Sequence, residues 1–212
     1  MIILGLTGSI GMGKSTAAAM LRRLGCPLYD ADAEVHRLLA PGGGAVVAVE
    51  ALFPGVTNPA GGIDRQRLGQ RVFANPDALH KLEAILHPVI RRTERRTVAL
   101  ARIHGQRLVV LDIPLLFETH ADRRCDLSLV VTAPRRVQRA RVMRRPGMTA
   151  ERFAAILRAQ VPDREKRRRA DFVVPTGLGR GVTYRRLKSI VRALRQGDVV
   201  PRAGGKIRGD RR

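Results

Sequence analysis

Five short apolar runs, separated by longer stretches with helical spacing, set the pattern of this chain. A continuous apolar run of this length is typical of a strand buried in a parallel sheet. Strands that alternate with helices indicate βαβ units, so we predict an α/β fold with a five-stranded parallel sheet flanked by helices. The predicted strands are Ile2–Thr7, Pro27–Tyr29, Arg107–Asp112, Leu127–Thr132 and Ala170–Val174.

A glycine-rich stretch joins the first strand to a helical pattern over residues 16–24. Its sequence, Gly8-Ser9-Ile10-Gly11-Met12-Gly13-Lys14-Ser15, has the phosphate-loop form G-x-x-x-x-G-K-[ST] in the strand–loop–helix context that this motif requires. Glycines let backbone N–H groups converge on one anion, and the N-terminus of the next helix adds partial positive charge. Lys14 is expected to reach the outer phosphates of a nucleoside triphosphate, and the Ser15 hydroxyl to bind Mg²⁺. The predicted nucleotide-binding residues are Gly8, Gly11, Met12, Gly13, Lys14, Ser15 and Thr16.

Aspartates come directly after the second predicted strand and at the end of the third, and ligands of open parallel sheets bind outside the carboxyl ends of strands. A kinase needs a carboxylate facing the acceptor hydroxyl, and we assign this role to Asp32, which is also well placed to start the next helix. For Asp30, capping of that helix is an equal alternative. Asp112 could serve as an acid that holds Mg²⁺ directly or through water, with a cap or structural carboxylate as the alternative.

The interval between the second and third strands is far longer than one crossover requires. Its pattern is helical: Asp64 caps a helix that runs to Phe73, Asn75 precedes a helix through Leu86, and Pro88 opens a third helix. We interpret this interval as an inserted helical subdomain that binds the acceptor substrate. Its arginines are typical of a solvated face, although one or two could hold substrate phosphates.

An arginine-rich helix–loop–helix follows the fourth strand and is typical of a lid. Arg141 and Arg145 are four residues apart, so we expect them on one helix face. On closure over ATP they could stabilise the charge of the migrating phosphoryl group. Thr149 is the predicted N-cap of the second lid helix, which runs to Gln160.

The predicted organisation is a P-loop NTPase-type core, an insertion, a lid and a tail. The core comprises residues 1–35, 105–134 and 171–195, the insertion 36–104 and the lid 135–170. An amphipathic helix from Tyr184 to Leu194 closes the core. The basic segment 196–212 is predicted to be disordered, because it is rich in Gly, Arg, Asp and Pro.

Composition limits the classes of partner. The formal net charge of +22 raises nucleic acid as a partner, but the charge is spread along the chain and only 3% of the residues are aromatic. Arginine also suits a polyanionic small molecule, so we predict no specific nucleic acid. We likewise expect no membrane partner, no signal peptide and no obligate protein partner. Cys26 and Cys125 are too few for a disulfide framework, which favours a reduced, cytoplasmic setting.

In their order, these motifs resemble those of the dephospho-coenzyme A kinases. The resemblance covers residues 1 to about 195. The phosphate loop alone indicates nucleotide binding, whereas the acidic triplet, the Leu-His-Pro step and the Asp-Ile-Pro-Leu-Leu-Phe-Glu segment are specific. The segments that carry it are Leu6–Thr16, Asp30–Asp32, Leu86–Pro88, Asp112–Glu118, Gln138 with Arg141 and Arg145, Gln160 with Lys166, and Ala170–Val174.

The resemblance implies the last step of coenzyme A biosynthesis, in which ATP phosphorylates the ribose 3′-hydroxyl of dephospho-CoA to give CoA and ADP. By position, Asp32 resembles the family's general base and Gly11–Thr16 its ATP loop. Arg141 and Arg145 fall on its lid positions, and His87 on the Leu-His-Pro step of its substrate-binding insertion.

Two positions depart from the family pattern. Met12 replaces a small residue, which should be tolerated if its side chain points out of the loop. Pro175-Thr176-Gly177 stands where the family often has asparagine, so the sequence does not indicate which groups recognise adenine.

Other functions with the same loop stay open. The nearest is another P-loop kinase, for a nucleoside monophosphate or a metabolite alcohol. A regulatory GTPase would use Asn- or Thr-Lys-x-Asp to read guanine, and neither motif occurs here. A nucleic-acid-stimulated ATPase is the remaining alternative.

Overall fold

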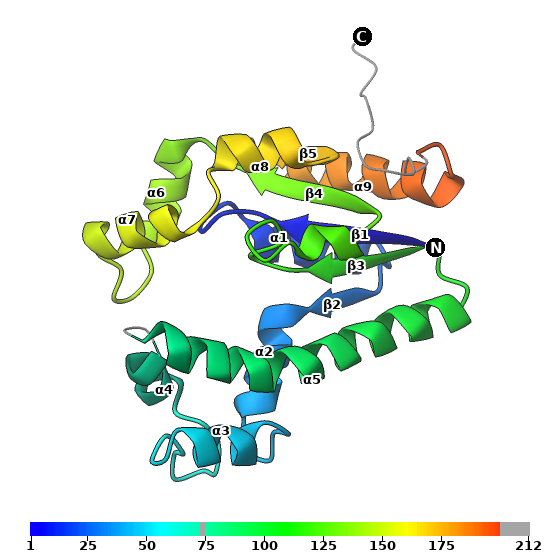
Figure 1. Ribbon diagram of the computed structural model, residues 1–212. Coiled ribbons are helices and arrows are strands. Elements are labelled where there is room, and N and C mark those ends of the chain that lie inside the picture. Colours follow the sequence, from blue (N-terminus) through cyan, green and yellow to red (C-terminus); the bar gives the residue numbers. More distant parts are fainter. Residues whose placement is uncertain (73–74, 200–212) are drawn as a thin grey trace. The chain divides into compact units, whose positions relative to one another are not determined.

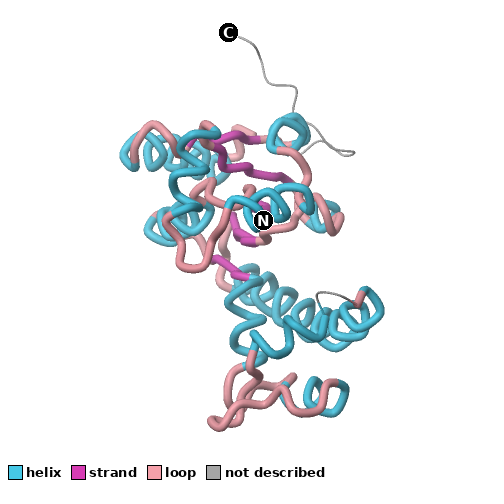
Figure 2. The backbone as a smooth tube through the Cα atoms, turned by 90° about the vertical axis from the view of Figure 1, so that its left-hand side faces the viewer, coloured by secondary structure: helices cyan, strands magenta, loops and turns pink. Residues whose placement is uncertain are grey.

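The computed structural model describes residues 1–72 and 75–199, which fall into two compact units (Figures 1 and 2). The first unit contains Met1–Tyr29 and the chain from Thr97 onward, and the second is Asp30–Arg96. Each unit has its own cluster of buried apolar side chains.

A five-stranded sheet forms the centre of the first unit, with the strand order β2-β3-β1-β4-β5 (Figure 1). β1 pairs in parallel with both β3 and β4, and β4 pairs in parallel with β5. This confirms the predicted sheet, and the central place of β1 brings the phosphate loop to the middle of its carboxyl edge. The strands are β1 Ile2–Thr7, β2 Leu28–Asp30, β3 Leu108–Asp112, β4 Leu127–Thr132 and β5 Phe172–Pro175.

Helices cover this sheet. α1 and α9 pack against each other and on the strands, so that Leu21 and Leu187 join Leu4, Leu6 and Leu129 of the sheet in one core. The helical elements of this unit are α1 Lys14–Arg23, the end of α5, the 3₁₀ turn η1 Ala121–Arg124, α6 Arg135–Met143, α7 Ala150–Ala159, α8 Asp163–Arg169 and α9 Arg180–Gln196.

Two of these helices differ from the sequence-based expectation. α9 starts at Arg180 rather than Tyr184. Where α8 forms, the sequence indicates only a basic run, because this segment has no apolar periodicity and its one buried residue is Lys166.

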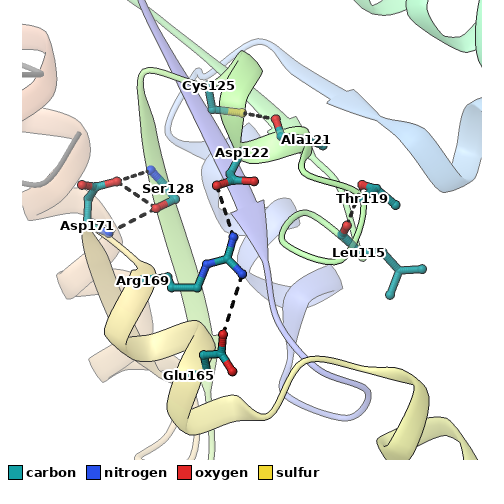
Figure 3. Close-up of polar contacts among 9 residues, drawn as sticks. All are labelled: Leu115, Thr119, Ala121, Asp122, Cys125, Ser128, Glu165, Arg169 and Asp171. Atoms are coloured by element: carbon teal, nitrogen blue, oxygen red, sulfur yellow. Dashed lines mark hydrogen bonds and ion pairs between the residues drawn. The ribbon is translucent and has the colours of Figure 1, made fainter. Parts of the chain in front are cut away.

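Polar contacts fix α8, and the residue just before β5, to η1 and β4 (Figure 3). The Arg169 guanidinium, at the end of α8, forms ion pairs with Asp122 of η1 at 3.4 Å and with Glu165 at 3.9 Å. The Asp171 carboxylate accepts hydrogen bonds from both the N–H and the hydroxyl of Ser128, each at 2.8 Å. The end of the arginine-rich segment is therefore tied to η1 and β4.

The second unit is helical and contains α2 Ala31–Leu39, α3 Val46–Leu52, α4 Arg65–Val72 and the larger part of α5 Pro76–Ile103. The prediction that Pro88 opens a new helix is wrong, because α5 runs through this residue. A proline inside a helix removes one backbone hydrogen bond, and the long apolar face of α5, with Leu82 and Leu86 buried, offsets that loss. The predicted end of the preceding helix at Phe73 lies outside the described residues, as does the predicted tail beyond residue 199.

A buried carboxylate joins α2 to α5 in this unit. Glu34 is 7% exposed and accepts hydrogen bonds from Arg37 at 2.6 and 2.9 Å and from the Thr93 hydroxyl at 2.9 Å. The Arg37 hydrogen bond is the main reason why the pKa of Glu34 lies below its ordinary value, with Thr93 adding to the effect against the opposing effect of burial. The ionised form of Glu34 therefore stabilises the folded state.

Glu34→Gln should lower the free energy of unfolding at pH 7 by about 1.5 kcal/mol, because hydrogen bonds to a charged acceptor are lost. A lowered folded-state pKa gives stability that is present above the ordinary value of 4.5 and is lost as the pH falls through the folded-state pKa. The difference between wild type and variant should therefore shrink below about pH 4.5 in urea unfolding. Glu83→Gln, at a more exposed glutamate, is the control, and an equal loss in that variant would contradict the assignment.

Two observations bear on the expectations that the chain has no membrane partner and no disulfide framework. Across residues 1–72 and 75–199, no helix has the length and apolarity needed to cross a membrane. Cys26 and Cys125 are both free thiols. Burial raises the pKa of the Cys26 thiol, against a smaller lowering by Arg195, which makes this cysteine a weak nucleophile at neutral pH.

Candidate active site

The phosphate loop takes its shape from glycines with positive φ. Gly11 and Gly13 have φ values of 75° and 88°, in the left-handed region that other residues rarely adopt. α1 begins immediately after Gly13, so Lys14, Ser15 and Thr16 form its first turn, where backbone N–H groups lack acceptors within the helix. The loop therefore presents the backbone donors and the helix N-terminus of an anion site.

Lys14 and Asp112 come together at the carboxyl edge of the sheet. β1 and β3 are neighbours with Leu6 opposite Asp112, and the Lys14 ammonium lies 2.9 Å from an Asp112 carboxylate oxygen. The Asp112 side chain is 2% exposed and that of Lys14 is 16% exposed. A buried carboxylate is thus placed beside the loop's lysine, a contact that the sequence does not predict.

Arg141 of α6 contacts another part of the loop. Its guanidinium donates to the Gly11 carbonyl at 3.4 Å and to the hydroxyl and carbonyl oxygens of Thr176 at 3.0 and 2.8 Å. The expected common helix face of Arg141 and Arg145 is wrong, because α6 ends at Met143 and Arg145 lies beyond it. Proline disfavours helical geometry in the residue before it, and residue 146 is a proline, which explains this end.

Met12 and Thr176 hold the centre of the loop. The Met12 side chain is 2% exposed and packs into the core, where its sulfur accepts a hydrogen bond from the Ala133 N–H at 3.0 Å. The Thr176 hydroxyl donates to the Met12 carbonyl at 2.7 Å. Both positions that depart from the family pattern therefore support the loop backbone.

Asp30 and Asp32 occupy different places at the start of α2. Asp30 is the N-cap, and its carboxylate accepts a hydrogen bond from the Ala33 N–H at 3.0 Å. Asp32 is an exposed residue of the first helical turn, so the expectation that it starts the helix is wrong. Capping accounts for Asp30 and leaves the role of Asp32 to be explained otherwise.

A pocket of about 490 Å³ lies along α5 in the second unit, lined by His87, Pro88, Arg91, Arg92 and Arg95. His87, Arg91 and Arg95 follow one another at intervals of four residues, so they share one face of the helix. Three guanidinium groups beside one pocket favour a ligand that carries phosphate groups.

Comparison with known families decides among the P-loop kinases. The family model described as dephospho-CoA kinase matches residues 2–177, which is most of the chain. The chain belongs to the dephospho-CoA kinase family. This confirms the resemblance inferred from the motifs.

Individual dephospho-CoA kinases match over most of their length. That of Novosphingobium aromaticivorans is 53% identical over 92% of this chain and 95% of its own. That of Paramagnetospirillum magneticum is 62% identical over 79% of this chain and 78% of its own. Among solved structures, dephospho-CoA kinase from Campylobacter jejuni has a TM-score of 0.71 at 25% identity, covering 93% of this chain and 98% of its own. TT1252 from Thermus thermophilus has a TM-score of 0.79 at 40% identity, covering 91% of this chain and 96% of its own.

The structure also explains two separate segments that carry the resemblance to dephospho-CoA kinases. Glu118, at the end of the segment after β3, accepts a hydrogen bond from the Val161 N–H at 2.9 Å and forms an ion pair with Lys166 at 2.8 Å. Lys166 is fully buried. The sequence singles out both Glu118 and Lys166 but gives no signal that they meet, because they lie on different elements far apart in the chain.

Proposed function

We propose that this protein transfers the γ-phosphoryl group of ATP to the ribose 3′-hydroxyl of dephospho-CoA, giving CoA and ADP, as the last step of coenzyme A biosynthesis. Membership of the dephospho-CoA kinase family is the observation that carries the proposal. The phosphate loop supports it from the nucleotide side, and the arginine-lined pocket on α5 supports it from the acceptor side.

Phosphoryl transfer depends mainly on alignment and on neutralisation of charge. In the proposed mechanism, backbone N–H groups of Gly11–Thr16 and the Lys14 ammonium hold the β- and γ-phosphates. Asp112 supports this arrangement, because its ion pair with Lys14 keeps the ammonium beside the loop. Arg145, which is exposed in the loop after α6, is a candidate to approach the transferred group, whereas Arg141 is held on Gly11 and Thr176.

Asp32 is the proposed general base for the acceptor. Its carboxylate accepts the proton of the ribose 3′-hydroxyl as that oxygen bonds to the γ-phosphorus and the bond from phosphorus to the leaving ADP oxygen breaks. Its exposure leaves the carboxylate accessible to a substrate, and the neighbouring Asp30 supplies the helix cap in its place. His87, Arg91 and Arg95 are proposed to bind phosphate groups of dephospho-CoA.

Mg²⁺ fits the donors available in the first unit. Ser15 is exposed in the first turn of α1, and the Asp112 carboxylate lies 2.9 Å from the ammonium of Lys14, the residue before Ser15. Hydroxyl and carboxylate oxygens suit this hard cation, which usually completes its coordination with waters and substrate phosphates. We therefore propose Ser15 as a direct ligand and Asp112 as a ligand that acts directly or through water. When bound, the ion would offset negative charge on the phosphates.

A coupled assay of ADP release tests the proposed reaction. The purified protein with ATP and Mg²⁺ should turn over dephospho-CoA at least about 100-fold more efficiently, in kcat/KM, than nucleoside monophosphates or metabolite alcohols, because these acceptors would leave polar groups of the acceptor site unpaired. A product bearing phosphate at the 3′ position should appear by mass spectrometry and NMR. Equal or better turnover of another acceptor would replace the proposal with the alternative kinase. Stimulation by RNA at a salt level that suppresses nonspecific binding would favour the nucleic-acid-dependent ATPase instead.

Loss of an arginine from the α5 pocket should weaken binding of the acceptor alone. Arg91→Ala or Arg95→Ala should raise KM for dephospho-CoA about tenfold, the effect of one charge-assisted hydrogen bond, with KM for ATP unchanged. Arg96→Ala is the matched control, because Arg96 is an exposed arginine of the same helix that does not line the pocket. A similar rise in the control would assign the effect to overall charge rather than to the pocket.

Several finer features of the sequence-based hypothesis remain predictions. These are the division into nucleotide core, acceptor-binding insertion and lid, the cytoplasmic location, and the lack of a specific nucleic acid or obligate protein partner. The assay above bears on the first of these through the substrate that each site variant affects.

A further inference from the structure

The backbone of Ile10, in the first half of the phosphate loop, is held at both its N–H and its carbonyl group by side-chain amides. The Ile10 N–H donates to the Gln160 amide oxygen at 3.1 Å, and the Gln138 amide nitrogen donates to the Ile10 carbonyl at 2.8 Å. Gln138 lies on α6 and Gln160 is the C-cap of α7. Both polar backbone groups of one loop residue are therefore bonded to the predicted lid.

Each glutamine is itself fixed in place. Gln138 is 4% exposed, and its backbone lies against the loop, since a Cβ atom on Gly11 would lie 3.0 Å from the Gln138 carbonyl oxygen. Gln160 is followed directly by Val161, whose N–H is bonded to Glu118. Glu118 is paired in turn with the buried Lys166. These contacts hold the backbone that carries each amide.

We propose that Gln138 and Gln160 are positioning residues for ATP, which set the backbone of the phosphate loop by clamping Ile10. This residue precedes Gly11–Thr16, whose N–H groups are the proposed phosphate donors. A loop whose entry is fixed at both its N–H and its carbonyl group loses less conformational entropy when it binds phosphate. The clamp thus acts on nucleotide affinity without touching the nucleotide.

The polarity of the two hydrogen bonds makes the proposal testable. The backbone N–H can only donate and the carbonyl can only accept, so Gln160 must accept and Gln138 must donate. Gln160→Glu keeps an acceptor, whereas Gln138→Glu loses the donor at neutral pH. Both substitutions add the same negative charge next to the same loop residue, so the difference between them isolates the hydrogen bond. Gln160→Met and Gln138→Met remove each bond without adding charge.

Equilibrium titration with a fluorescent ADP analogue and steady-state KM for ATP are the readouts. Gln160→Glu should bind within about threefold of wild type, and Gln160→Met about five- to tenfold more weakly, the loss expected for one hydrogen bond. Gln138→Met should also bind about five- to tenfold more weakly, and Gln138→Glu more weakly still. KM for dephospho-CoA should stay unchanged in all four. Relative to wild type at the same pH, the affinity of Gln138→Glu should recover as the pH is lowered and the carboxyl group regains a proton to donate.

A purely structural role predicts a different pattern. Loss of a purely structural contact would lower the thermal stability of the nucleotide-free protein and weaken the binding of both substrates alike. Gln160→Glu would then be no better than Gln160→Met. Equal impairment of Gln160→Glu and Gln160→Met, or wild-type nucleotide affinity in all variants, would overturn the proposal. If the Gln138 variants fail to fold, the pair at position 160 decides alone.

This inference rests on ATP being the nucleotide of the proposed function, but not on the acceptor. The titration measures nucleotide binding without turnover. A protein that binds the ADP analogue with the expected pattern yet fails to phosphorylate dephospho-CoA would contradict the proposed function and leave the clamp supported.

Discussion

Asp32→Asn should lower kcat for dephospho-CoA by about 10³-fold while leaving KM for ATP within about twofold of wild type, because a general base contributes about 10²- to 10⁴-fold to rate. Asparagine keeps the size of the side chain and removes its capacity to accept a proton. The loss should therefore appear in single-turnover measurements of phosphoryl transfer as well as in steady-state kcat. Affinity for dephospho-CoA, measured by titration with the ADP complex, should change little.

Asp30→Asn is the matched control for this experiment. Asp30 caps α2 through its side-chain oxygen, and asparagine is about as good an N-cap as aspartate. Activity of Asp30→Asn should stay within a few-fold of wild type. Near-normal turnover by Asp32→Asn would remove Asp32 from the proposed role, and a large loss in Asp30→Asn alone would move the base to that residue.

Lys14→Met should reduce both stability and catalysis, and the two effects should be separable. The substitution leaves the buried Asp112 carboxylate without its lysine, which should lower the free energy of unfolding by about 3 kcal/mol in urea titrations. It also removes the proposed ligand of the outer phosphates. We expect kcat/KM for ATP to fall by at least about 10³-fold.

The double variant Lys14→Met with Asp112→Asn separates the two effects. Removal of the carboxylate charge should restore most of the lost stability, because a buried carboxylate that has lost its ion pair with Lys14 is the main cost of the single substitution. It should restore none of the activity. Lys188→Met, at an exposed lysine of α9, is the control for loss of one positive charge. If the double variant were as unstable as the single one, the ion pair would not be the source of the destabilisation.

Local patterns in the sequence are sufficient to predict much of the fold. The apolar run of Ile2–Thr7 and the glycines after it specify a strand and a loop through neighbouring residues alone, and β1 and the start of α1 follow them closely. Thr149 likewise caps α7 as predicted, through a hydrogen bond from the Arg152 N–H. These features depend on interactions within a few residues, which a single sequence displays.

The features that the sequence does not predict depend on residues far apart in the chain. Pro88 is a helix-breaking signal that the packing of α5 overrides, and α8 has a buried lysine where a helix pattern would show apolar residues. The clamp joins Ile10 to Gln138 and Gln160, which lie 128 and 150 positions further along the chain, and no local pattern indicates such contacts. Asp112 can be named as a candidate, but its contact with Lys14 depends on the register of β1 and β3.

The short segment after β3 connects two side chains that support the phosphate loop from different sides. It follows Asp112, the last residue of β3 and the partner of the loop lysine, and it ends at Glu118, which secures the backbone next to Gln160. Its length therefore sets the spacing between these two supports. A residue inserted or deleted between the two acids would shift one against the other, and would thereby misplace the Lys14 side and the Ile10 side of the loop together.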